Sequence, residues 1–403
     1  MKIGIIGGGA AGIMAALQIK GHEVHIFERN NRIGKKLLAT GNGRCNYTNL
    51  NMGPEYYHGE DRDFVKPALN YFGKEETIDF FKSHLMLSTS IENGRTYPVT
   101  LKASSVLNLF LRELEKKNIY IHTNYFLRQI EKTKGRFKLQ FKDEEPFYVD
   151  RVVFATGGMS MPVSGSDGNG YRILKSLGHT LVEPFPGLVQ VKLKSEFLRH
   201  LAGTKVVGEV RLIKEDKVIG REEGDLLFTK YGISGPPILD LSRKVGENLN
   251  SKLYMEIPFV NNLEKGFESF AVNAFNNSDS TLGEFIEGVC DKKFLRVVEA
   301  LINIDKNTPL KEINDSLRDR IIKVLQSTRF EVEGLNGYGE SQVTCGGIST
   351  EEVNSETMES KIIKGLYLIG EALDVDGDCG GYNIQWAFSS AALCGKVLSL
   401  EDI

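Results

Sequence analysis

The first residues of the chain alternate short apolar runs with glycine. Ile3–Leu17 contains only apolar residues and glycine, and Gly7, Gly8 and Gly9 interrupt this run after four residues. A secretion signal needs a basic segment followed by an unbroken apolar core, and this segment has neither. The pattern instead predicts a short buried strand, a glycine turn and a helix, followed by a second strand at EVHIFE (23–28).

The rest of the first half predicts a loop, two helical regions and a group of strands. Residues 30–60 are polar and rich in Gly and Asn, as expected for an ordered functional loop. Helices are expected around 61–84 and 103–117, the latter with apolar residues at helical spacing. From 119 to 154 short β-prone stretches are separated by turn residues, which predicts an antiparallel meander.

The second half of the chain changes character twice. Residues 185–260 are β-rich and predict a small barrel or sandwich, whereas 262–327 show helical patterns broken by Asn and Ser. Strands return at 329–348, and 361–401 end with a strand, a glycine-rich loop and a helix. This order predicts a nucleotide-binding domain whose last strand and helix come from the far end of the chain.

Composition is that of a soluble globular protein. The 403 residues are 41% hydrophobic and 26% charged, and 50 Lys plus Arg against 53 Asp plus Glu give a net charge of −3. The near-neutral balance argues against nucleic-acid binding, and no run reaches the ~18 apolar residues of a membrane span. Five scattered cysteines without a CxxC pair indicate reduced thiols in the cytoplasm and predict no metal site.

The glycine turn carries the first chemical signal. Residues 7–12 (GGGAAG) fit the GxGxxG fingerprint in its expected strand–turn–helix context. Gly7 would permit the tight turn, Gly9 the approach of a pyrophosphate, and Gly12 close packing of helix on strand. Glu28, at the end of the second strand, would accept hydrogen bonds from ribose hydroxyls and disfavour a 2′-phosphate. The turn therefore predicts FAD or NAD.

Two later elements favour FAD over NAD. Residues 152–158 (VVFATGG) resemble the strand that returns the chain past the cofactor in two-dinucleotide-binding flavoproteins. Residues 365–371 (GLYLIGE) resemble the late strand of those enzymes, whose acidic residue binds the ribityl chain of FAD. Glu371 takes that place here.

Three longer stretches resemble the signature of one bacterial flavoprotein family. They are GKKLLATGNGRCNYTN (34–49), LLFTKYGISGPP (226–237) and GEALDVDGDCGGYNIQ (370–385). Members of this family are described as aminoacetone-oxidase-like or as BaiN-like dehydro-bile-acid reductases, NAD(P)/FAD-dependent oxidoreductases. The resemblance covers essentially the whole chain.

The resemblance implies an α/β fold in which a glutathione-reductase-type, Rossmann-like FAD-binding domain carries an inserted β-barrel and a small helical bundle. We assign residues 1–184 plus 340–403 to the FAD-binding domain. Residues 185–260 plus 328–339 are assigned to the barrel, and 261–327 to the helical insert.

Polar loops around the predicted cofactor supply the remaining site residues. Lys35, Lys36 and Arg44 lie beyond the adenosine site, where cations can face the pyrophosphate or an anionic reduced flavin. The helix that begins near Asn383 can direct its N–H groups to the flavin N1–C2=O edge. The predicted cofactor-binding residues are Gly7, Gly9, Ala11, Gly12, Glu28, Arg29, Lys35, Lys36, Thr40, Gly41, Asn42, Cys45, Asn46, Phe126, Ala155, Thr156, Gly157, Gly370, Glu371, Asn383 and Ile384.

Some side chains near these loops have a structural interpretation as well. Trp386 and Phe388 are expected in the core rather than stacked on the flavin ring. Flavin disulfide reductases use two closely spaced cysteines, and none lies near Cys45 in sequence, so dithiol chemistry is not expected. Cys379 lies in the other cofactor loop, which leaves a spatial pair with Cys45 open.

The chain is predicted to be an FAD-dependent oxidoreductase acting on a small molecule, with two reactions open. Residues 164–170 (SGSDGNG) do not follow a separate strand and so form no second fingerprint for NAD(P)H. The flavin would be reduced by the substrate, as in an amine oxidase using O₂, or by transiently bound NAD(P)H, as in a reductase of a conjugated ketone. Analogy with the family favours the reductase.

No catalytic residue is predicted. Tyr231 and Tyr382 are weak candidates for the proton donor of a reductase or the aromatic cage of an oxidase. A non-catalytic or RNA-modifying flavoprotein is the alternative from another class, and the absence of a basic tract argues against RNA. The sequence predicts neither a membrane partner nor an oligomeric state.

Overall fold

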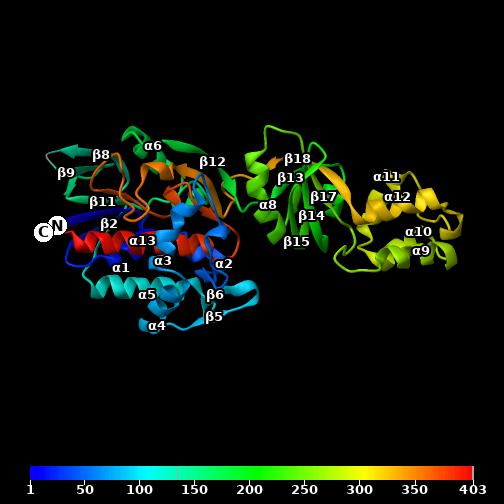
Figure 1. Cartoon of the computed structure of the whole chain (residues 1–403), viewed down its shortest axis with the longest axis horizontal. Helices are drawn as coiled ribbons and strands as arrows, with labels where there is room; N and C mark the ends of the chain where they lie inside the picture. The colour runs from blue at the N-terminus through cyan, green and yellow to red at the C-terminus, as the bar shows by residue number, and fades with distance from the viewer. Residues whose placement is uncertain (134, 402–403) are drawn as a thin grey trace. The chain divides into compact units, whose positions relative to one another are not determined.

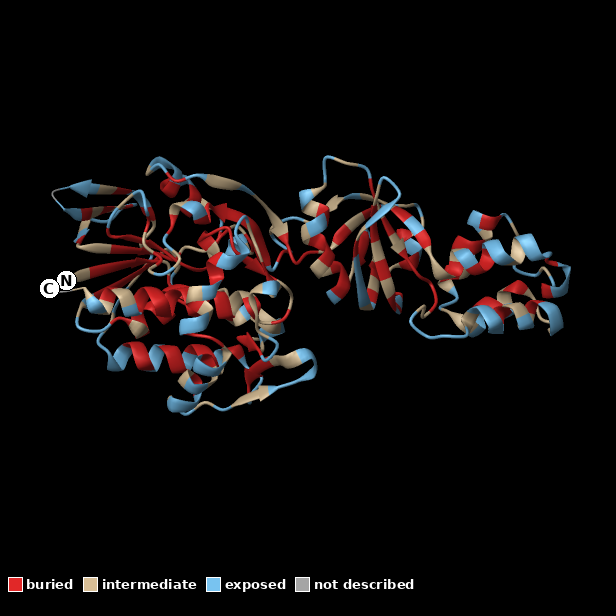
Figure 2. Cartoon of the chain, viewed as in Figure 1, coloured by how far each residue is buried: buried red, intermediate tan, exposed pale blue. Residues whose placement is uncertain are grey.

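The computed structural model describes residues 1–133 and 135–401. The chain divides into two compact units, Met1–Pro186 with Tyr338–Ile403, and Gly187–Gly337. Each unit has its own hydrophobic core (Figure 2). Both ends of the chain therefore build the first unit, where the N-terminal and C-terminal segments lie side by side (Figure 1). The division into three domains with the bounds given above stays a prediction.

A five-stranded parallel sheet forms the centre of the first unit, in the order β20-β11-β1-β2-β7. Its strands, in chain order, are β1 (Lys2–Ile6), β2 (Glu23–Glu28), β7 (Tyr120–Thr123), β11 (Arg151–Phe154) and β20 (Leu366–Leu368). The late strand β20 joins this sheet, as the sequence predicted, and it pairs with β11. The predicted α/β Rossmann-like fold is confirmed.

Three helices pack beside this sheet (Figure 1). They are α1 (Ala10–Gln18), α5 (Ala103–Lys116) and α13 (Tyr382–Leu400). The helices α1 and α13 contact each other so closely that a Cβ atom on Gly395 would lie 2.6 Å from Cβ of Gln18. Most residues of α13 are buried, which explains its apolar and small-residue sequence (Figure 2).

The predicted meander over 119–154 is only partly correct. An antiparallel sheet does form from β8 (Leu127–Thr133), β9 (Arg136–Phe141) and β10 (Phe147–Val149). The first predicted strand, β7, and the second half of the last one, β11, belong instead to the parallel sheet. Because β7 is an edge strand with exposed side chains, its pattern does not differ from that of an antiparallel strand.

Small elements surround the parallel sheet. The helical region predicted at 61–84 is interrupted at Phe72 and Gly73, where the backbone N–H of Gly73 donates to Glu76 Oε2 at 2.9 Å. The helices are η3 (Arg62–Val65), α3 (Lys66–Tyr71), α4 (Lys74–Ser83) and α6 (Asn169–Ser176). The small sheets are β3 (Thr48–Asn49) with β6 (Arg95–Pro98) and β5 (Ser88–Ser90), β4 (Tyr57–His58) with β21 (Asp376–Gly377), and β12 (Leu181–Gly187) with β19 (Val343–Ile348).

The second unit contains a closed barrel in the order β13-β16-β15-β14-β17-β18. The strands are β13 (Val191–Lys194), β14 (Lys205–Lys214), β15 (Lys217–Thr229), β16 (Gly232–Ser234), β17 (Leu253–Ile257) and β18 (Thr328–Leu335). Alternate residues of β14 are buried, which gives the barrel its interior. The helix α8 (Pro236–Glu247) was not predicted, although prolines occupy its first turn.

Four helices lie between the barrel strands β17 and β18 in the chain. They are α9 (Phe267–Asn277), α10 (Leu282–Val289), α11 (Lys293–Ile302) and α12 (Asp315–Gln326). The rings of Phe259 and Phe294 stack with centroids 4.2 Å apart and join the helices to the barrel in one core. Among the described residues, no helix combines the length and apolarity that crossing a bilayer requires.

Candidate cofactor site

Of the glycines between β1 and the first turns of α1, Gly7, Gly8 and Gly12 leave no room for a side chain, and a Cβ atom on Gly8 would lie 2.4 Å from Cγ2 of Ile33. Gly7 has φ +106°, and a Cβ atom on it would lie 2.4 Å from the carbonyl oxygen of Ala155. A Cβ atom on Gly12 would lie 1.9 Å from the carbonyl oxygen of Gly7. By contrast, a Cβ atom on Gly9 would meet nothing within 4 Å. The fold itself requires Gly7 and Gly12, whereas the space beside Gly9 is open to a ligand.

The carboxyl ends of the parallel strands bring further predicted residues to this turn. A Cβ atom on Gly370, just after β20, would lie 2.9 Å from Cβ of Ala11 in the first turn of α1. The backbone N–H of Ala155, at the end of β11, donates to the carbonyl of Ile6 at 2.8 Å. Thr156 and Gly157 follow, and Gly157 has φ +71°. This edge of a parallel sheet is where nucleotides bind in such folds.

Glu28 ends β2 with its carboxylate fixed by the protein. Oε2 accepts a hydrogen bond from the backbone N–H of Gly8 at 2.9 Å. Oε1 accepts from the backbone N–H and from Nδ2 of Asn30, at 2.8 and 2.7 Å. Glu28 is 8% exposed. The carboxylate thus lies beside the glycine turn, and its remaining lone pairs suit the ribose hydroxyls that the sequence assigns to it.

Arg29 and Phe126, two predicted cofactor residues, contact each other. The guanidinium carbon of Arg29 lies 4.6 Å from the centroid of the Phe126 ring, a cation–π contact. Nη1 of Arg29 also lies 2.6 Å from Asp167 Oδ1 and donates to the carbonyl of Gly165 at 3.4 Å. The sequence does not predict this role of Asp167, because its contact with Arg29 joins two segments that are far apart in the chain.

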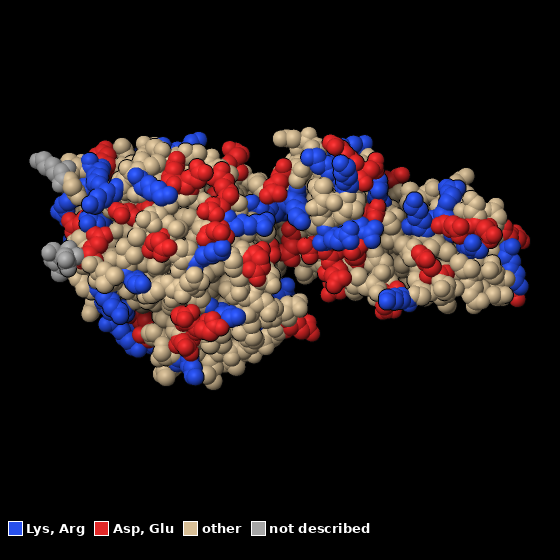
Figure 3. All heavy atoms as spheres, in the orientation of Figure 1, with Lys and Arg blue, Asp and Glu red and all other residues tan. Residues whose placement is uncertain are grey.

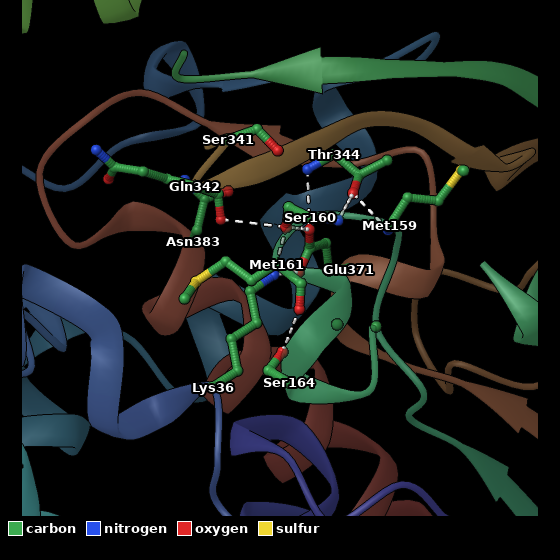
Figure 4. Close-up of polar contacts among 12 residues, drawn as sticks. Lys36, Met159, Ser160, Met161, Ser164, Ser341, Gln342, Thr344, Glu371 and Asn383 are labelled. Carbon is green, nitrogen blue, oxygen red and sulfur yellow. Dashed lines mark hydrogen bonds and ion pairs between the residues drawn. The ribbon is translucent and has the colours of Figure 1, made fainter. Parts of the chain in front are cut away.

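A polar network joins Lys36 and Glu371 (Figure 4). Nζ of Lys36 lies 2.6 Å from Glu371 Oε2 and 2.5 Å from Ser160 Oγ. Oε1 of Glu371 accepts from Ser160 Oγ at 2.8 Å and from the backbone N–H of Thr344 at 2.9 Å. Sequence reasoning placed Lys36 and Glu371 at different parts of the cofactor, and the structure pairs them. Ser160 and Thr344 were missed, since neither lies in a recognised motif.

The segment after η1 (Leu37–Ala39), which contains the short and irregular helix α2 (Thr40–Gly43), follows a tightly turned path. Gly41, Asn42 and Cys45 have φ values of +57°, +55° and +60°. Nε of Arg44 donates to the carbonyl of Gly41 at 3.2 Å, and its guanidinium carbon lies 5.0 Å from the centroid of the Tyr97 ring. Because left-handed conformations are uncommon for residues other than glycine, the surrounding contacts must hold this path.

The thiol of Cys45 is poorly suited to act as a nucleophile. Its side chain is fully buried, and burial raises its pKa to about 12, although Thr40 hydrogen-bonds it. The thiol is therefore neutral near pH 7, whereas a nucleophilic cysteine reacts as the thiolate. No disulfide links it to Cys379. Lys35, in the same loop, is half-buried and forms no ion pair within the described part of the chain.

The N-terminus of α13 lies against the strand β3. Gly381 precedes the helix with φ +104°, and its Cβ atom would lie 2.5 Å from the carbonyl oxygen of Thr48 and 2.7 Å from Asn46 Oδ1. Asn46 Oδ1 and Thr48 Oγ1 are buried without a hydrogen-bond partner among the described residues. The side chain of Asn383, by contrast, is occupied by the backbone N–H and carbonyl of Gly377, at 2.8 and 2.7 Å.

These residues fit FAD along its length. The open space beside Gly9 and the uncapped N-terminus of α1 suit a pyrophosphate, and Glu28 suits the ribose. Ser166 Oγ, which is buried without a partner in the described residues, would lie 3.1 Å from a Cβ atom on Gly157. Asn46 Oδ1 and the first-turn N–H groups of α13, a turn that includes Ile384, suit the polar edge of a flavin. Bound FAD supplies hydride-transfer chemistry at this site.

Four aromatic residues near the predicted site loops differ in how far they are buried. Trp386 and Phe388 are 1% and 0% exposed, and both lie in the core, as predicted. The hydroxyl of Tyr382 donates to the carbonyl of Asn51 at 3.3 Å, and its ring is 5% exposed. Tyr231 is 40% exposed and belongs to the second unit. Neither tyrosine gains support as a proton donor.

Comparison with known proteins agrees with this geometry. The model of the family described as HI0933-like protein Rossmann domain matches residues 1–397. The chain is 38% identical to a 3-dehydro-bile acid delta(4,6)-reductase of Clostridium scindens, with 98% of each chain covered. It is 31% identical to a ribosomal RNA dihydrouridine synthase of Escherichia coli, over 98% of this chain and 97% of the relative.

Solved structures extend the likeness at the level of the fold. A 3-ketosteroid delta1-dehydrogenase of Sterolibacterium denitrificans superposes with a TM-score of 0.51 at 11% identity, covering 98% of this chain and 99% of that one. The chain belongs to the HI0933-like family of Rossmann-fold flavoproteins and is an FAD-dependent oxidoreductase.

Proposed function

We propose that the protein reduces a carbon–carbon double bond conjugated to a carbonyl group in a small organic substrate, with NAD(P)H as the source of electrons. The observation that carries this proposal is the similarity to two relatives, a 3-dehydro-bile acid delta(4,6)-reductase and a ribosomal RNA dihydrouridine synthase, which act on related double bonds. In a 3-oxo steroid nucleus the 4,6 double bonds are conjugated to the ketone, and in uridine the reducible C5=C6 bond is conjugated to the C4 carbonyl. Conjugate reduction of such a bond takes up a hydride at an electrophilic carbon, which is β to the carbonyl in an enone or in uridine and δ to it for the 6,7 bond of a 4,6-dienone.

A small ring system like that of a bile acid is the favoured substrate. The supporting observation is the 38% identity to the bile-acid reductase, against 31% to the RNA enzyme. Charge supports the same choice, because the net charge is −3 and basic and acidic side chains are interspersed on the face shown in Figure 3. The missing nicotinamide fingerprint is compatible with NAD(P)H that binds only transiently.

Ribosomal RNA is the second candidate substrate, because a relative with that activity is 31% identical over nearly the whole chain. The absence of a nucleic-acid partner, which the sequence predicts, therefore stays a prediction. The amine-oxidase alternative has less support, since neither relative named above is an amine oxidase.

The proposed function is tested by separating the two half-reactions under anaerobic conditions. The FAD-loaded protein is mixed with NADH, NADPH or aminoacetone, and flavin absorbance is followed. The reduced protein is then mixed with a 3-oxo-4-ene bile acid or with ribosomal RNA lacking dihydrouridine. We expect NAD(P)H to bleach the flavin absorbance. The bile acid should then restore the flavin absorbance, and its product should carry two more hydrogen atoms. Bleaching by aminoacetone alone would refute the reductase, and reoxidation by RNA alone would select the second candidate.

A further inference from the structure

Two arginines share one face of the small sheet β3–β6–β5. Side chains alternate along a strand, so Arg95 and Tyr97 of β6 project from the same face. Arg44 places its guanidinium over the ring of Tyr97, with its carbon 5.0 Å from the ring centroid. We call the surface formed by Arg44, Arg95 and Tyr97 the arginine face.

The arginine face lies against both loops predicted to meet the flavin ring. Asn49 of β3 pairs with Arg95 in the sheet, and its Nδ2 donates to the carbonyl of Gly380 at 2.9 Å, directly before the N-terminus of α13. On the other side, a Cβ atom on Gly41 would lie 3.4 Å from the Tyr97 ring. The face therefore borders the predicted flavin edge rather than a remote surface.

Neither guanidinium of the arginine face is neutralised by the protein. Within residues 1–133 and 135–401, neither Arg44 nor Arg95 forms an ion pair, and both are half-buried. Arg29 and Arg151 of the same unit, by comparison, each contact a carboxylate oxygen at 2.6 Å. Partial burial of an unpaired guanidinium costs free energy. Its planar donors also match a carboxylate or phosphate in geometry.

We propose that Arg44 and Arg95 bind an anionic group of the substrate, a carboxylate or a phosphate, and so hold its conjugated ring beside the flavin. The contact of Arg44 with Gly41 and Tyr97 fixes its position, while its two Nη atoms remain available to the anion. This inference rests on the proposed function and adds to it that the substrate carries a negative charge. A carboxylate would come from an acidic steroid-like compound, and a phosphate from a nucleotide unit.

Binding can be tested without turnover. The oxidised, FAD-loaded protein is titrated with a 3-oxo-4-ene bile acid, its methyl ester, uridine 5′-monophosphate and uridine, and Kd is read from the change in the flavin spectrum. We expect one charged compound to bind at least about tenfold more tightly than its neutral counterpart, as a charge-assisted contact allows. The pair that shows this difference identifies carboxylate or phosphate as the anion.

Variants assign the difference to the arginine face. Arg95→Gln and Arg44→Gln should remove the preference for the charged compound, and Arg95→Lys should restore part of it. Arg128→Gln is the matched control, because Arg128 is exposed on β8. A preference that survives both Gln variants, or charged compounds that bind no better than neutral ones, would overturn the inference. Charge-dependent binding without subsequent reoxidation of reduced flavin would instead refute only the proposed function.

Discussion

Gly9 shows how a single residue can separate the demands of the fold from those of the cofactor. A Cβ atom on Gly12 would overlap the carbonyl oxygen of Gly7, at 1.9 Å, whereas one on Gly9 would meet nothing within 4 Å. The fingerprint assigns close packing to Gly12 and the approach of the pyrophosphate to Gly9, and the space around the two glycines agrees with this division. The structure thus identifies Gly9 as the position where a substitution reports on the ligand.

We predict that Gly9→Val abolishes retention of FAD without unfolding the protein. The added side chain would occupy space that the fold leaves open, so FAD affinity should fall at least tenfold, about 1.4 kcal/mol. The ratio of flavin to protein absorbance measures retention, and the melting temperature of the apoprotein measures the fold. Gly12→Val is the control that should damage folding itself. A yellow Gly9→Val protein would show that the pyrophosphate lies elsewhere.

The Lys36–Glu371 pair illustrates what sequence reasoning could and could not reach. Both residues were predicted from motifs, but their pairing was not, because 335 residues separate them in the chain. Ser160 and Thr344, which complete the network, lie in segments without a motif. Motifs therefore predicted which loops surround the cofactor, and the contacts among those loops needed the fold.

A double-mutant cycle tests whether this pair acts as a unit. Lys36→Met and Glu371→Gln should each lower stability by roughly 1–3 kcal/mol, because each leaves a half-buried partner without its counter-charge. The double variant should be less destabilised than the sum, with a coupling of about 0.5–3 kcal/mol. Chemical unfolding of the apoprotein measures stability, and fluorescence titration measures FAD affinity. Strictly additive effects would contradict the coupling.

At the scale of elements, the sequence predicted best those segments whose burial follows a clear period. The helix α5 shows such a period, and the strands β1 and β2 were predicted from short apolar runs that are almost continuously buried. The edge strand β7 was placed in the wrong sheet, because its residues are exposed or half-buried and it lacks the continuous burial that is typical of a parallel strand. Strand pairing depends on contacts between distant segments, which local patterns do not encode.

A histidine pair, with His25 buried and His122 half-buried, joins the parallel sheet to the antiparallel sheet and makes this junction sensitive to pH. Nδ1 of His25 lies 2.9 Å from Nε2 of His122, and His25 lies 4.8 Å from the Phe147 ring of β10, measured between centroids. Burial lowers the pKa of both histidines, and it outweighs Glu23, whose Oε1 lies 2.7 Å from His25 Nε2. The charge of Lys2 also lowers the pKa of His25, and a protonated His25 lowers the pKa of His122.

We therefore predict that acidification destabilises the first unit through this pair. A histidine with a lowered pKa binds fewer protons folded than unfolded, so stability is complete above the unfolded pKa near 6.5 and falls as the pH drops through the folded values. The melting temperature of the apoprotein should decrease between about pH 6.5 and 5. His122→Phe, which keeps an aromatic ring beside Phe27, should reduce this decrease, whereas His84→Gln should not. Identical pH profiles for wild type and His122→Phe would contradict the assignment.

At the scale of the whole molecule, the second unit is a single insertion with its own core. The chain enters and leaves it side by side, since the backbone N–H of Asn336 donates to the carbonyl of Gln190 at 3.0 Å and β13 pairs with β18. The predicted cofactor residues, from Gly7 to Ile384, all fall within the first unit. Binding of FAD and folding of the insertion should therefore be separable.

We predict that replacing residues 187–337 with a short Gly-Ser linker leaves a protein that still binds FAD. The linker needs to bridge only a narrow gap, because Gln190 and Asn336, close to the two ends of the insertion, are joined by a hydrogen bond, and a short flexible linker adds little closure entropy. The isolated fragment 187–337 should melt cooperatively and stay colourless, since its barrel is closed and its core is continuous. Removing α13 from the full chain is the contrasting variant, and it should abolish both solubility and FAD binding because most of that helix is buried. A linker variant that folds but cannot retain FAD would show that the insertion contributes to the cofactor site.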